Sequence, residues 1–203
     1  MFNRKTPLQK GSKKLIGAWT LYDWANSVYS LVISTAIFPI YYSEYIFANS
    51  DSILLFNMDI NKDTVISLVS ATSFMIVAFL SPLLSGIADY LGNKKTFMKF
   101  FVYMGSFSCI GLYWFELETI QVSLILYLLA LIGLWGSLVF YNSYLPDITY
   151  PEQTNIVSAK GFTMGYIGSV ILLIINLIMI TYYEQLNLSS EVQAMKYSFV
   201  LVG

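Results

Sequence analysis

Residues 119–146, TIQVSLILYLLALIGLWGSLVFYNSYLP, contain no Asp, Glu, Lys or Arg. A helix needs about 20 predominantly apolar residues to cross the hydrocarbon core of a bilayer, which is about 30 Å thick. The composition of the 203-residue chain agrees with a membrane location, because 57% of the residues are hydrophobic and 11% are charged. Soluble domains carry about 25% charged residues. The stretch therefore predicts a membrane-spanning helix.

Other apolar stretches between charged residues are also long enough to cross a bilayer. The sequence predicts an all-α fold, a polytopic membrane helix bundle with five complete transmembrane helices and a truncated sixth. Residues 1–14 form a basic segment ahead of the bundle, which occupies residues 15–203. The predicted spans lie at about 15–42, 64–88, 96–115, 119–146, 161–183 and, incomplete, 197–203. Because the last stretch is too short, we expect a fragment that pairs with the rest of the same protein or with a second copy.

The basic residues predict the orientation of the bundle. With a cytoplasmic N-terminus, only Lys62 and Lys196 of the 11 Lys and Arg residues lie outside. The residues on the inner side are then Arg4, Lys5, Lys10, Lys13, Lys14, Lys94, Lys95, Lys99 and Lys160. Lys and Arg in short loops accumulate on the cytoplasmic side. We therefore predict a multi-pass integral membrane protein with its N-terminus in the cytoplasm.

The composition excludes several classes of function. A formal net charge of −1 leaves no basic surface that follows a phosphate backbone, so nucleic acid is excluded as a partner. The chain has no His and one Cys, so His-dependent catalytic triads, H-E-x-x-H zinc sites and internal disulfides are impossible. We predict a protein that is not an enzyme and needs no metal or cofactor, with the lipid bilayer and a small-molecule substrate as its partners.

Asp23 interrupts the first predicted span, about 12 Å of helix rise from Leu15. Ionisable side chains at such depth face protein or water and usually belong to a pathway or binding site. On a helical wheel Asp23 shares one face with Trp19, Thr20, Asn26, Ser27, Ser30 and Ser34. This polar stripe predicts a helix that lines a polar cavity. The alternative is that Asp23 reaches the cytoplasmic interface and only caps or orients the helix.

Residues 85–95, SGIADYLGNKK, form the short inner turn after the second predicted span. Gly86 permits close approach by another helix, and Gly92 can adopt a positive φ to turn the chain. Asp89 can pair with a helix N-terminus or a cation, and Lys94 and Lys95 keep the turn inside. The alternative is an ordinary positive-inside hairpin, which explains the lysines but not the Gly and Asp spacing.

This turn resembles the loop motif of the major facilitator superfamily, approximately G-x-x-x-D-R-x-G-R-R/K between the second and third helices. Tyr90 and Asn93 stand where the family usually has basic residues. The resemblance implies the N-terminal half of a major facilitator fold, in which the motif packs against the other half and helps hold the outward-facing state. We regard Gly86, Asp89, Gly92, Lys94 and Lys95 as the candidate gating motif. The fourth span has no Arg, so the buried basic residue of many proton-coupled members is absent.

Three segments resemble the vacuole-effluxer branch of that superfamily, the autophagy-related amino-acid permeases. They are residues 19–30 (WTLYDWANSVYS), 140–148 (FYNSYLPDI) and 158–168 (SAKGFTMGYIG). Ser169 departs from the pattern, because a further glycine is expected there. The resemblance covers roughly residues 15–183 and implies efflux or uptake of a small solute, with amino acids as the best-supported class. It also implies a location in the plasma (inner) membrane if the protein is bacterial, or in the vacuolar membrane if it is fungal.

Further polar and small residues fall within the predicted spans. Gly161, Gly165 and Gly168 permit the fifth span to pack closely on a neighbour, either as a moving helix or in static contact. The amides of Asn142 and Asn176 are poorly tolerated by lipid. The candidate residues for binding substrate or a coupling ion are Tyr22, Asp23, Asn26, Ser30, Asn142, Tyr166 and Asn176.

Three functions compete for these residues. The first is a secondary active transporter that works by alternating access, with the first, second, fourth and fifth spans around a central cavity. The second is an intramembrane aspartyl protease, suggested by Tyr22-Asp23. Such an enzyme needs a second embedded Asp in a Gly-x-Gly-Asp setting, and residues 86–89 lack the second glycine. The third is a non-transporting membrane scaffold or assembly subunit. We favour the transporter.

Overall fold

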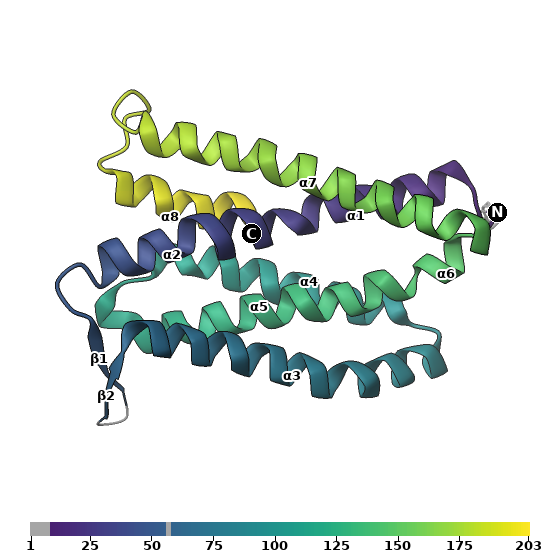
Figure 1. Ribbon diagram of the computed structural model, residues 1–203, viewed down its shortest axis with the longest axis horizontal. Helices are drawn as coiled ribbons and strands as arrows, with labels where there is room; N and C mark the ends of the chain where they lie inside the picture. Colours follow the sequence, from purple (N-terminus) through teal and green to yellow (C-terminus); the bar gives the residue numbers. More distant parts are fainter. Residues whose placement is uncertain (1–8, 56–57) are drawn as a thin grey trace, which may run out of the picture.

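The structure, a computed structural model, describes residues 9–55 and 58–203, apart from the side chains of Leu55, Asp89 and Leu91. Long helices run side by side along the longest axis of the molecule (Figure 1). One end of the bundle holds the start of α1 (Lys13–Val28), the turn between α3 (Lys62–Leu91) and α4 (Lys94–Gly111), and α6 (Leu145–Ile148). The opposite end holds a β-hairpin and the connection between α7 (Pro151–Thr181) and α8 (Glu191–Val202).

The first helical segment contains two π-helical parts. It comprises α1 (Lys13–Val28), η1 (Tyr29–Ile37, π), α2 (Phe38–Ile40) and η2 (Tyr41–Ile46, π), and it includes the predicted span 15–42. Ser12 caps α1, because its side chain accepts a hydrogen bond from the backbone N–H of Leu15. In η1 the Thr35 hydroxyl donates to the Ser30 carbonyl at 2.9 Å. Pro39 has no backbone N–H, so the helical ladder loses one donor there.

The predicted all-α fold needs one correction at the second connection. Strands β1 (Ser52–Leu55) and β2 (Met58–Asn61) form an antiparallel hairpin in which Ser52 pairs with Asn61. Partly buried Ile53 and Ile60 pair in this ladder and pack against the hydrophobic core, which favours the extended form. The hairpin leads directly into α3 (Lys62–Leu91).

The remaining helices agree with the predicted spans but differ at their ends. They are α4 (Lys94–Gly111), η3 (Leu112–Trp114), η4 (Leu117–Thr119), α5 (Ile120–Ser143), α6 (Leu145–Ile148), α7 (Pro151–Thr181) and α8 (Glu191–Val202). Helix α7 begins ten residues before the predicted start at 161, because Pro151 occupies its first turn after the extended Tyr150. Helix α8 begins before 197, where the Ser190 side chain accepts from the Gln193 N–H. The predicted spans contain only apolar stretches and so leave out the charged first turns of α7 and α8, which nevertheless form helix.

Among the described residues, three helices are by themselves long and apolar enough to cross a membrane. They cover Lys62–Ala88, Leu117–Ile148 and Pro151–Thr181. The predicted spans at 15–42 and 96–115 are helical as well, but Asp23 and the lysines of α1 and α4 make them more polar. The count of five complete spans therefore stays a prediction.

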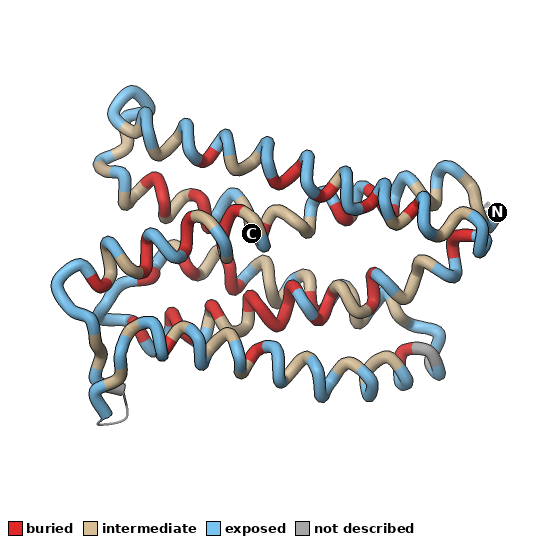
Figure 2. Tube along the Cα trace, viewed as in Figure 1, coloured by how far each residue is buried: buried red, intermediate tan, exposed pale blue. Residues whose placement is uncertain are grey.

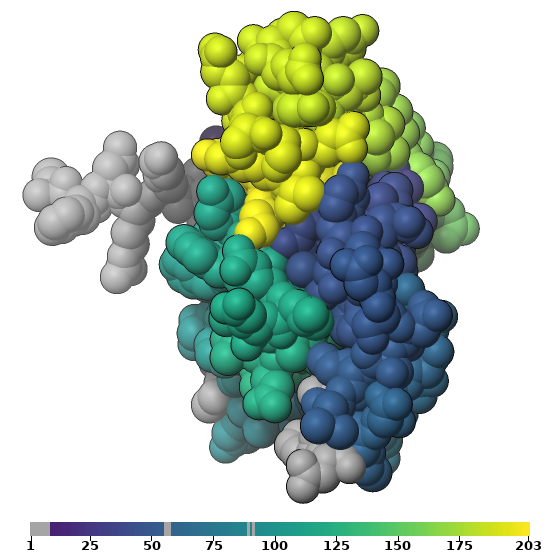
Figure 3. All heavy atoms as spheres, turned by 90° about the vertical axis from the view of Figure 1, so that its left-hand side faces the viewer, coloured from purple at the N-terminus to yellow at the C-terminus, as the bar shows by residue number. Residues whose placement is uncertain are grey.

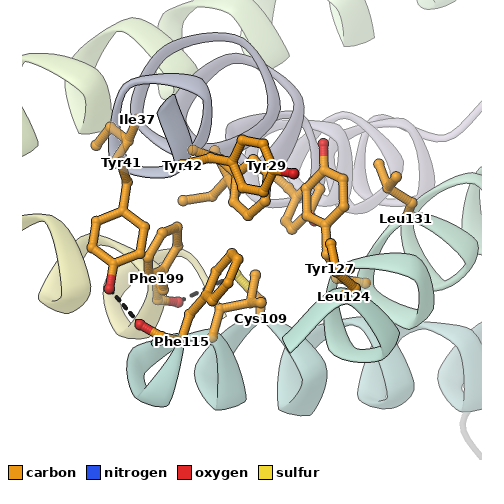
Figure 4. Close-up of a cluster of buried hydrophobic side chains, with 14 of the residues drawn as sticks. Tyr29, Ile37, Tyr41, Tyr42, Cys109, Phe115, Leu124, Tyr127, Leu131 and Phe199 are labelled. Carbon is orange, nitrogen blue, oxygen red and sulfur yellow. Dashed lines mark hydrogen bonds between the residues drawn. The ribbon is translucent and has the colours of Figure 1, made fainter. Parts of the chain in front are cut away.

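An aromatic core fills the half of the bundle near the hairpin (Figure 4). The rings of Phe38 and Tyr127 stack with their centroids 4.0 Å apart. The Tyr41 hydroxyl donates to the Phe115 carbonyl, and the Cys109 thiol donates to the Phe199 carbonyl at 3.3 Å. These contacts join the first helical segment to α5 and to the residue after η3, and α4 to α8. Figure 2 shows the buried residues on the inward sides of the helices, while α3 and α7 carry exposed residues along their outer sides.

Two glycines bring α4 and α5 into backbone contact. A Cβ atom placed on Gly133 of α5 would lie 2.4 Å from the Cα atom of Gly105 in α4. Real side chains do not approach a backbone so closely, so position 133 requires glycine, whereas a Cβ atom on Gly105 would lie 3.3 Å from the Gly133 Cα atom, a tight contact. Small residues permit such close helix packing.

Polar contacts hold helix α8 in place at the hairpin end of the bundle. Figure 3 views this end and shows α8 between α7 and the connection from α4 to α5. Lys196 of α8 lies 2.7 Å from the Glu116 carboxylate in that connection. The hydrogen bond from Lys196 and its positive charge hold the pKa of Glu116 below its ordinary value. On the other side, the Tyr45 hydroxyl donates to Glu191 at 2.8 Å.

Candidate functional site

The polar residues of α1 divide between two neighbouring helices. Asp23 and Ser27, one turn apart, lie against α7. Tyr22 and Asn26, also one turn apart, lie on the side of α5. Part of the stripe predicted from the sequence therefore lies in two helix contacts, with a carboxylate on the α7 side and an amide on the α5 side, whereas Ser30 is exposed.

Asp23 is almost fully buried in the contact with α7, with 6% of its surface exposed. One carboxylate oxygen accepts a hydrogen bond of 3.2 Å from the Ser27 hydroxyl. Gly165 of α7 faces this pair, and a Cβ atom there would lie 3.2 Å from Asp23 Oδ2. An ionised carboxylate at such a place is costly unless a proton or a cation neutralises it. The pair is thus chemically suited to hold a proton or a small cation.

Asn26 connects α1 to α5 through its side-chain oxygen. Its Oδ1 accepts hydrogen bonds from the Tyr22 hydroxyl and the Ser137 hydroxyl, both at 3.3 Å. Its Nδ2 is buried and makes no hydrogen bond to any residue that the structure describes. A buried amide N–H without a partner costs free energy.

A cavity of about 220 Å³ opens beside Asn26. Residues of α1 and η1, α4 and α5 form its walls, and the end of α8 closes one side. Its hydrogen-bonding side chains are Tyr22, Asn26, Tyr29, Ser106 and Ser137. It is smaller than most ligand pockets, which measure about 300–1,000 Å³.

An aromatic cluster closes the gap between α1 and α5 on the N-terminal side of Asn26. The Trp19 indole N–H donates to the Tyr141 carbonyl at 3.0 Å, and the two rings stack with centroids 4.3 Å apart. The Tyr22 ring lies 5.0 Å from that of Tyr141. Gly161 of α7 leaves room for the Trp19 ring, because a Cβ atom there would lie 2.6 Å from it. The cluster joins three helices at one level.

The other predicted binding residues lie apart from the cavity. Ser30 and Asn142 are exposed, and Tyr166 on α7 has 69% of its surface exposed. Asn176 is fully buried and donates through Nδ2 to the Leu172 carbonyl of its own helix at 2.7 Å. Of the seven candidates, the structure places Tyr22 and Asn26 in the cavity wall and Asp23 beside them, on the α7 side. A binding role for the other four stays a prediction.

The loop after α3 adopts the predicted turn. Gly92 has a φ of +62°, which confirms the expected positive φ. Lys94 lies 3.0 Å from Asp147 and so ties this turn to α6, whereas Lys95 is exposed. Gly86 is exposed and no described atom lies within 4 Å of a Cβ placed there, so the close helix contact expected at Gly86 is not made inside this chain. The predicted role of the Asp89 side chain lies outside the described residues.

Sequence reasoning missed part of the cavity wall. Ser106, Ser137 and Tyr29 stand in stretches whose apolar character dominated the interpretation. Ser137 could have been found from the sequence, because it follows Gly133 by one turn. The two residues place a small and a polar side chain on the same helix face. Pro39 was the signal for an irregular first helix, but it does not specify a π-helix.

Comparison with known proteins finds one family profile and two relatives that match most of the chain. The profile of the family described as "Vacuole effluxer Atg22 like" matches residues 11–203. The chain is 39% identical over 173 residues to the "Uncharacterized MFS-type transporter YxiO" of Bacillus subtilis (strain 168), a match that covers 85% of this chain. It is 29% identical over 159 residues to an "Uncharacterized protein" of Aquifex aeolicus (strain VF5), which covers 77% of this chain.

The matches cover a limited part of these relatives. They span 39% of the Bacillus protein and 36% of the Aquifex protein, so the chain covers less than half the length of either. No solved structure matches the chain significantly.

Proposed function

Because the chain belongs to the Vacuole effluxer Atg22 like family, we propose that it forms part of a secondary active transporter that moves a small solute across a membrane. Amino acids are the first class of solute to test, since the vacuole-effluxer segments of the sequence resemble amino-acid permeases. The protein acts as a permease and not as an enzyme. The MFS-type relative supports this class of function.

One observation carries the proposal: Asp23 and Asn26 are held on the first helix between α5 and α7, inside an apolar bundle. Lipid cannot satisfy a carboxylate or an amide, and ionisable side chains within membrane helices usually belong to a pathway or binding site. Asp23 offers a negative charge for a proton, a cation or a substrate ammonium group. Asn26 lines the cavity beside it.

We propose that transport proceeds by alternating access, in which helices around a fixed site rock and expose it to one side at a time. The exposed Gly86 and the turn at Gly92 would then meet a second helical unit and help hold one of the two states. That unit is a later part of the same protein or a second copy of this chain. The mass of the protein extracted from its native membrane tells these two alternatives apart. A mass well above the 23.0 kDa of this chain indicates a later part of the same protein, and a mass of 23.0 kDa indicates a second copy.

The proposed orientation places the N-terminus in the cytoplasm. Helix α1 begins with Lys13 and Lys14 and α4 with Lys94 and Lys95, and both helices begin at the end of the bundle that holds α6. Lys160 lies in the first third of α7, which begins at that end as well. Helix α3, whose first residue is Lys62, and α8, which contains Lys196, begin at the opposite end. This distribution supports an inner side at the end that holds α6. Thiol labelling of single-cysteine variants in intact cells tests it.

A scaffold without transport activity is the second candidate, and one observation favours it. Asp23 and Ser27 pack directly on Gly165, as they would in a static helix contact. A scaffold role predicts that Asp23 affects assembly and not solute flux. The following experiment separates the two functions.

The protein as its native cell makes it is purified and reconstituted in liposomes, and uptake of radiolabelled amino acids is measured with and without a proton or sodium gradient. We expect Asp23→Asn to lower uptake at least about tenfold, a loss of about 1.4 kcal/mol, while elution profile and unfolding temperature stay normal. Asp59→Asn, an exposed position on β2, is the matched control and should retain uptake. Normal uptake by Asp23→Asn contradicts its role, and no uptake of any amino acid by the unmodified protein contradicts the substrate class.

A further inference from the structure

Helix α5 keeps one exposed side within the described part of the bundle. Its Gly133 contacts α4, and its Ser137 contacts α1. Trp135 and Asn142 lie two turns apart on this helix, roughly opposite Gly133 on a helical wheel, and both are exposed. The exposed side of α5 therefore turns away from α4.

Trp135 and Ser30 lie at the depth of the bilayer midplane. The apolar helix Leu117–Ile148 has its midpoint about 4 Å of helix rise from Trp135. Asn26 of α1 bonds Ser137, and Ser30 follows Asn26 by one turn toward the hairpin end. Because α5 runs in the opposite direction to α1, Trp135 lies on the same side of the Asn26–Ser137 contact as Ser30. Ser30 is exposed as well.

The chemistry at this level differs from that of side chains suited to lipid. The exposed side chains along α3 and α7 include Phe79, Leu83 and Ile174, which hydrocarbon accepts. A hydroxyl and an indole N–H need hydrogen-bond partners that hydrocarbon does not offer, and Trp concentrates at membrane–water interfaces. Neither the Ser30 hydroxyl nor the Trp135 indole makes a hydrogen bond within the part of the chain that the structure describes. Two such residues at the midplane indicate contact with water or a solute.

Phe74 of α3 supports the Trp135 ring. The two ring centroids lie 5.4 Å apart with an interplanar angle of 61°, an edge-to-face arrangement that is favourable for aromatic pairs. The contact holds the indole between α3 and α5. Since 36% of the Trp135 surface is still exposed, part of the side chain is left to contact another molecule.

We infer that Trp135 contacts the transported solute, and that a water-accessible pathway runs along this side of α5. The inference rests on the proposed transport function and adds a specificity-determining residue to it. Substrate sites of secondary transporters lie near the bilayer midplane, between two helical units. The Trp135 ring packs on a nonpolar part of the solute, and the Ser30 hydroxyl lies at the same level.

Cysteine labelling tests the pathway. Trp135→Cys is made in the protein as its native cell makes it, with Cys109→Ala and any further cysteines replaced, and is treated in liposomes with a charged methanethiosulfonate reagent. Phe107→Cys on α4 is the matched control, because Phe107 is 71% exposed and follows Gly105 by two residues, as Trp135 follows the contacting Gly133. A charged reagent avoids hydrocarbon, so we expect labelling at position 135 to be at least about tenfold faster than at 107. Equal rates, or no labelling at position 135, overturn the inference.

A second cysteine position keeps this test decisive if Trp135→Cys does not fold. Phe74 lies beside Trp135 and is 48% exposed, so Phe74→Cys should be labelled faster than Phe107→Cys as well. Slow labelling of Phe74→Cys in the folded protein places this side of α5 in lipid and overturns the pathway.

Uptake kinetics in the same liposomes test the contact with the solute. We expect Trp135→Phe to raise the KM for the transported solute about fivefold with kcat unchanged, because the lost contact stabilises ground and transition states alike. Trp114→Phe, at a position 66% exposed, is the control and should keep the KM. An unchanged KM in Trp135→Phe and in Trp135→Ala overturns the contact. If position 135 is labelled but the unmodified protein takes up no amino acid, the proposed amino-acid transport fails and the pathway stands.

Discussion

Gly165 of α7 packs so closely on Asp23 of α1 that an added Cβ atom would lie 3.2 Å from Asp23 Oδ2, and only 2.5 Å from the neighbouring Ser27 Oγ. The carboxylate is therefore held against the backbone of another helix, with the Ser27 hydroxyl as its hydrogen-bond donor. Glycine at this position is what brings the acidic residue of the first helix into a buried contact.

Gly165→Ala should destabilise the protein. The extra methyl group pushes on Ser27 and Asp23, and overpacking of this kind costs roughly 1–3 kcal/mol. The unfolding temperature in detergent measures the effect. Gly17→Ala on α1 is the control, because no described atom lies within 4 Å of its added Cβ. Equal unfolding temperatures for the two variants would contradict the close contact.

Trp19→Phe should weaken the contact between α1 and α5 at Trp19 and Tyr141. The substitution keeps an aromatic ring near Tyr141 but removes the indole N–H that donates to the Tyr141 carbonyl. A single hydrogen bond contributes about 0.5–1.5 kcal/mol to stability, and we expect a loss of that order in denaturant unfolding. Trp114→Phe, at a position 66% exposed, should change stability little. A larger loss of stability in Trp114→Phe than in Trp19→Phe would contradict the hydrogen bond between Trp19 and Tyr141.

The ion pair between Lys196 and Glu116 should make the docking of α8 sensitive to acid. Since folding lowers the pKa of Glu116 from its ordinary 4.5, the pair stabilises the fold above that pH and is lost as the pH falls through the lowered value. Lys196→Met should therefore lower the unfolding temperature at neutral pH but not in strong acid. Lys99→Met, at an exposed position of α4, serves as the control. A constant effect of Lys196→Met at all pH values would contradict the ionic origin.

Lys94 and Asp147 should be energetically coupled. Their 3.0 Å contact joins the turn after α3 to α6, and the Asp147 side chain is 54% exposed. Partly exposed ion pairs contribute roughly 0.2–1 kcal/mol. A double-mutant cycle with Lys94→Met and Asp147→Asn should give a coupling in that range, which falls with added salt. Full additivity of the two substitutions would show that the contact does not contribute.

The sequence predicts the helical bundle because length and apolarity alone decide what a bilayer accepts. The helical character of all five long stretches is confirmed, and so is membership of the vacuole-effluxer family. Helix ends were less predictable. Polar first turns such as the one at Pro151 extend the helices beyond the apolar stretches and carry no hydropathy signal.

The candidate site was only partly predictable. Periodicity placed Asp23 and Asn26 on one face of the first helix, but it does not tell which neighbour each one meets. The contact of Asp23 with Gly165 and that of Asn26 with Ser137 depend on how three helices cross. Nor does a local pattern reveal a cavity, because its walls come from residues far apart in the chain.

The glycine crossing of α4 and α5 has a mechanical consequence. With Gly105 and Gly133 in backbone contact, no side chain lies between these two helices to yield when their crossing is compressed. The opposite wall of the cavity, the α1–η1 segment, differs from them, because its backbone departs from regular α-helical hydrogen bonding.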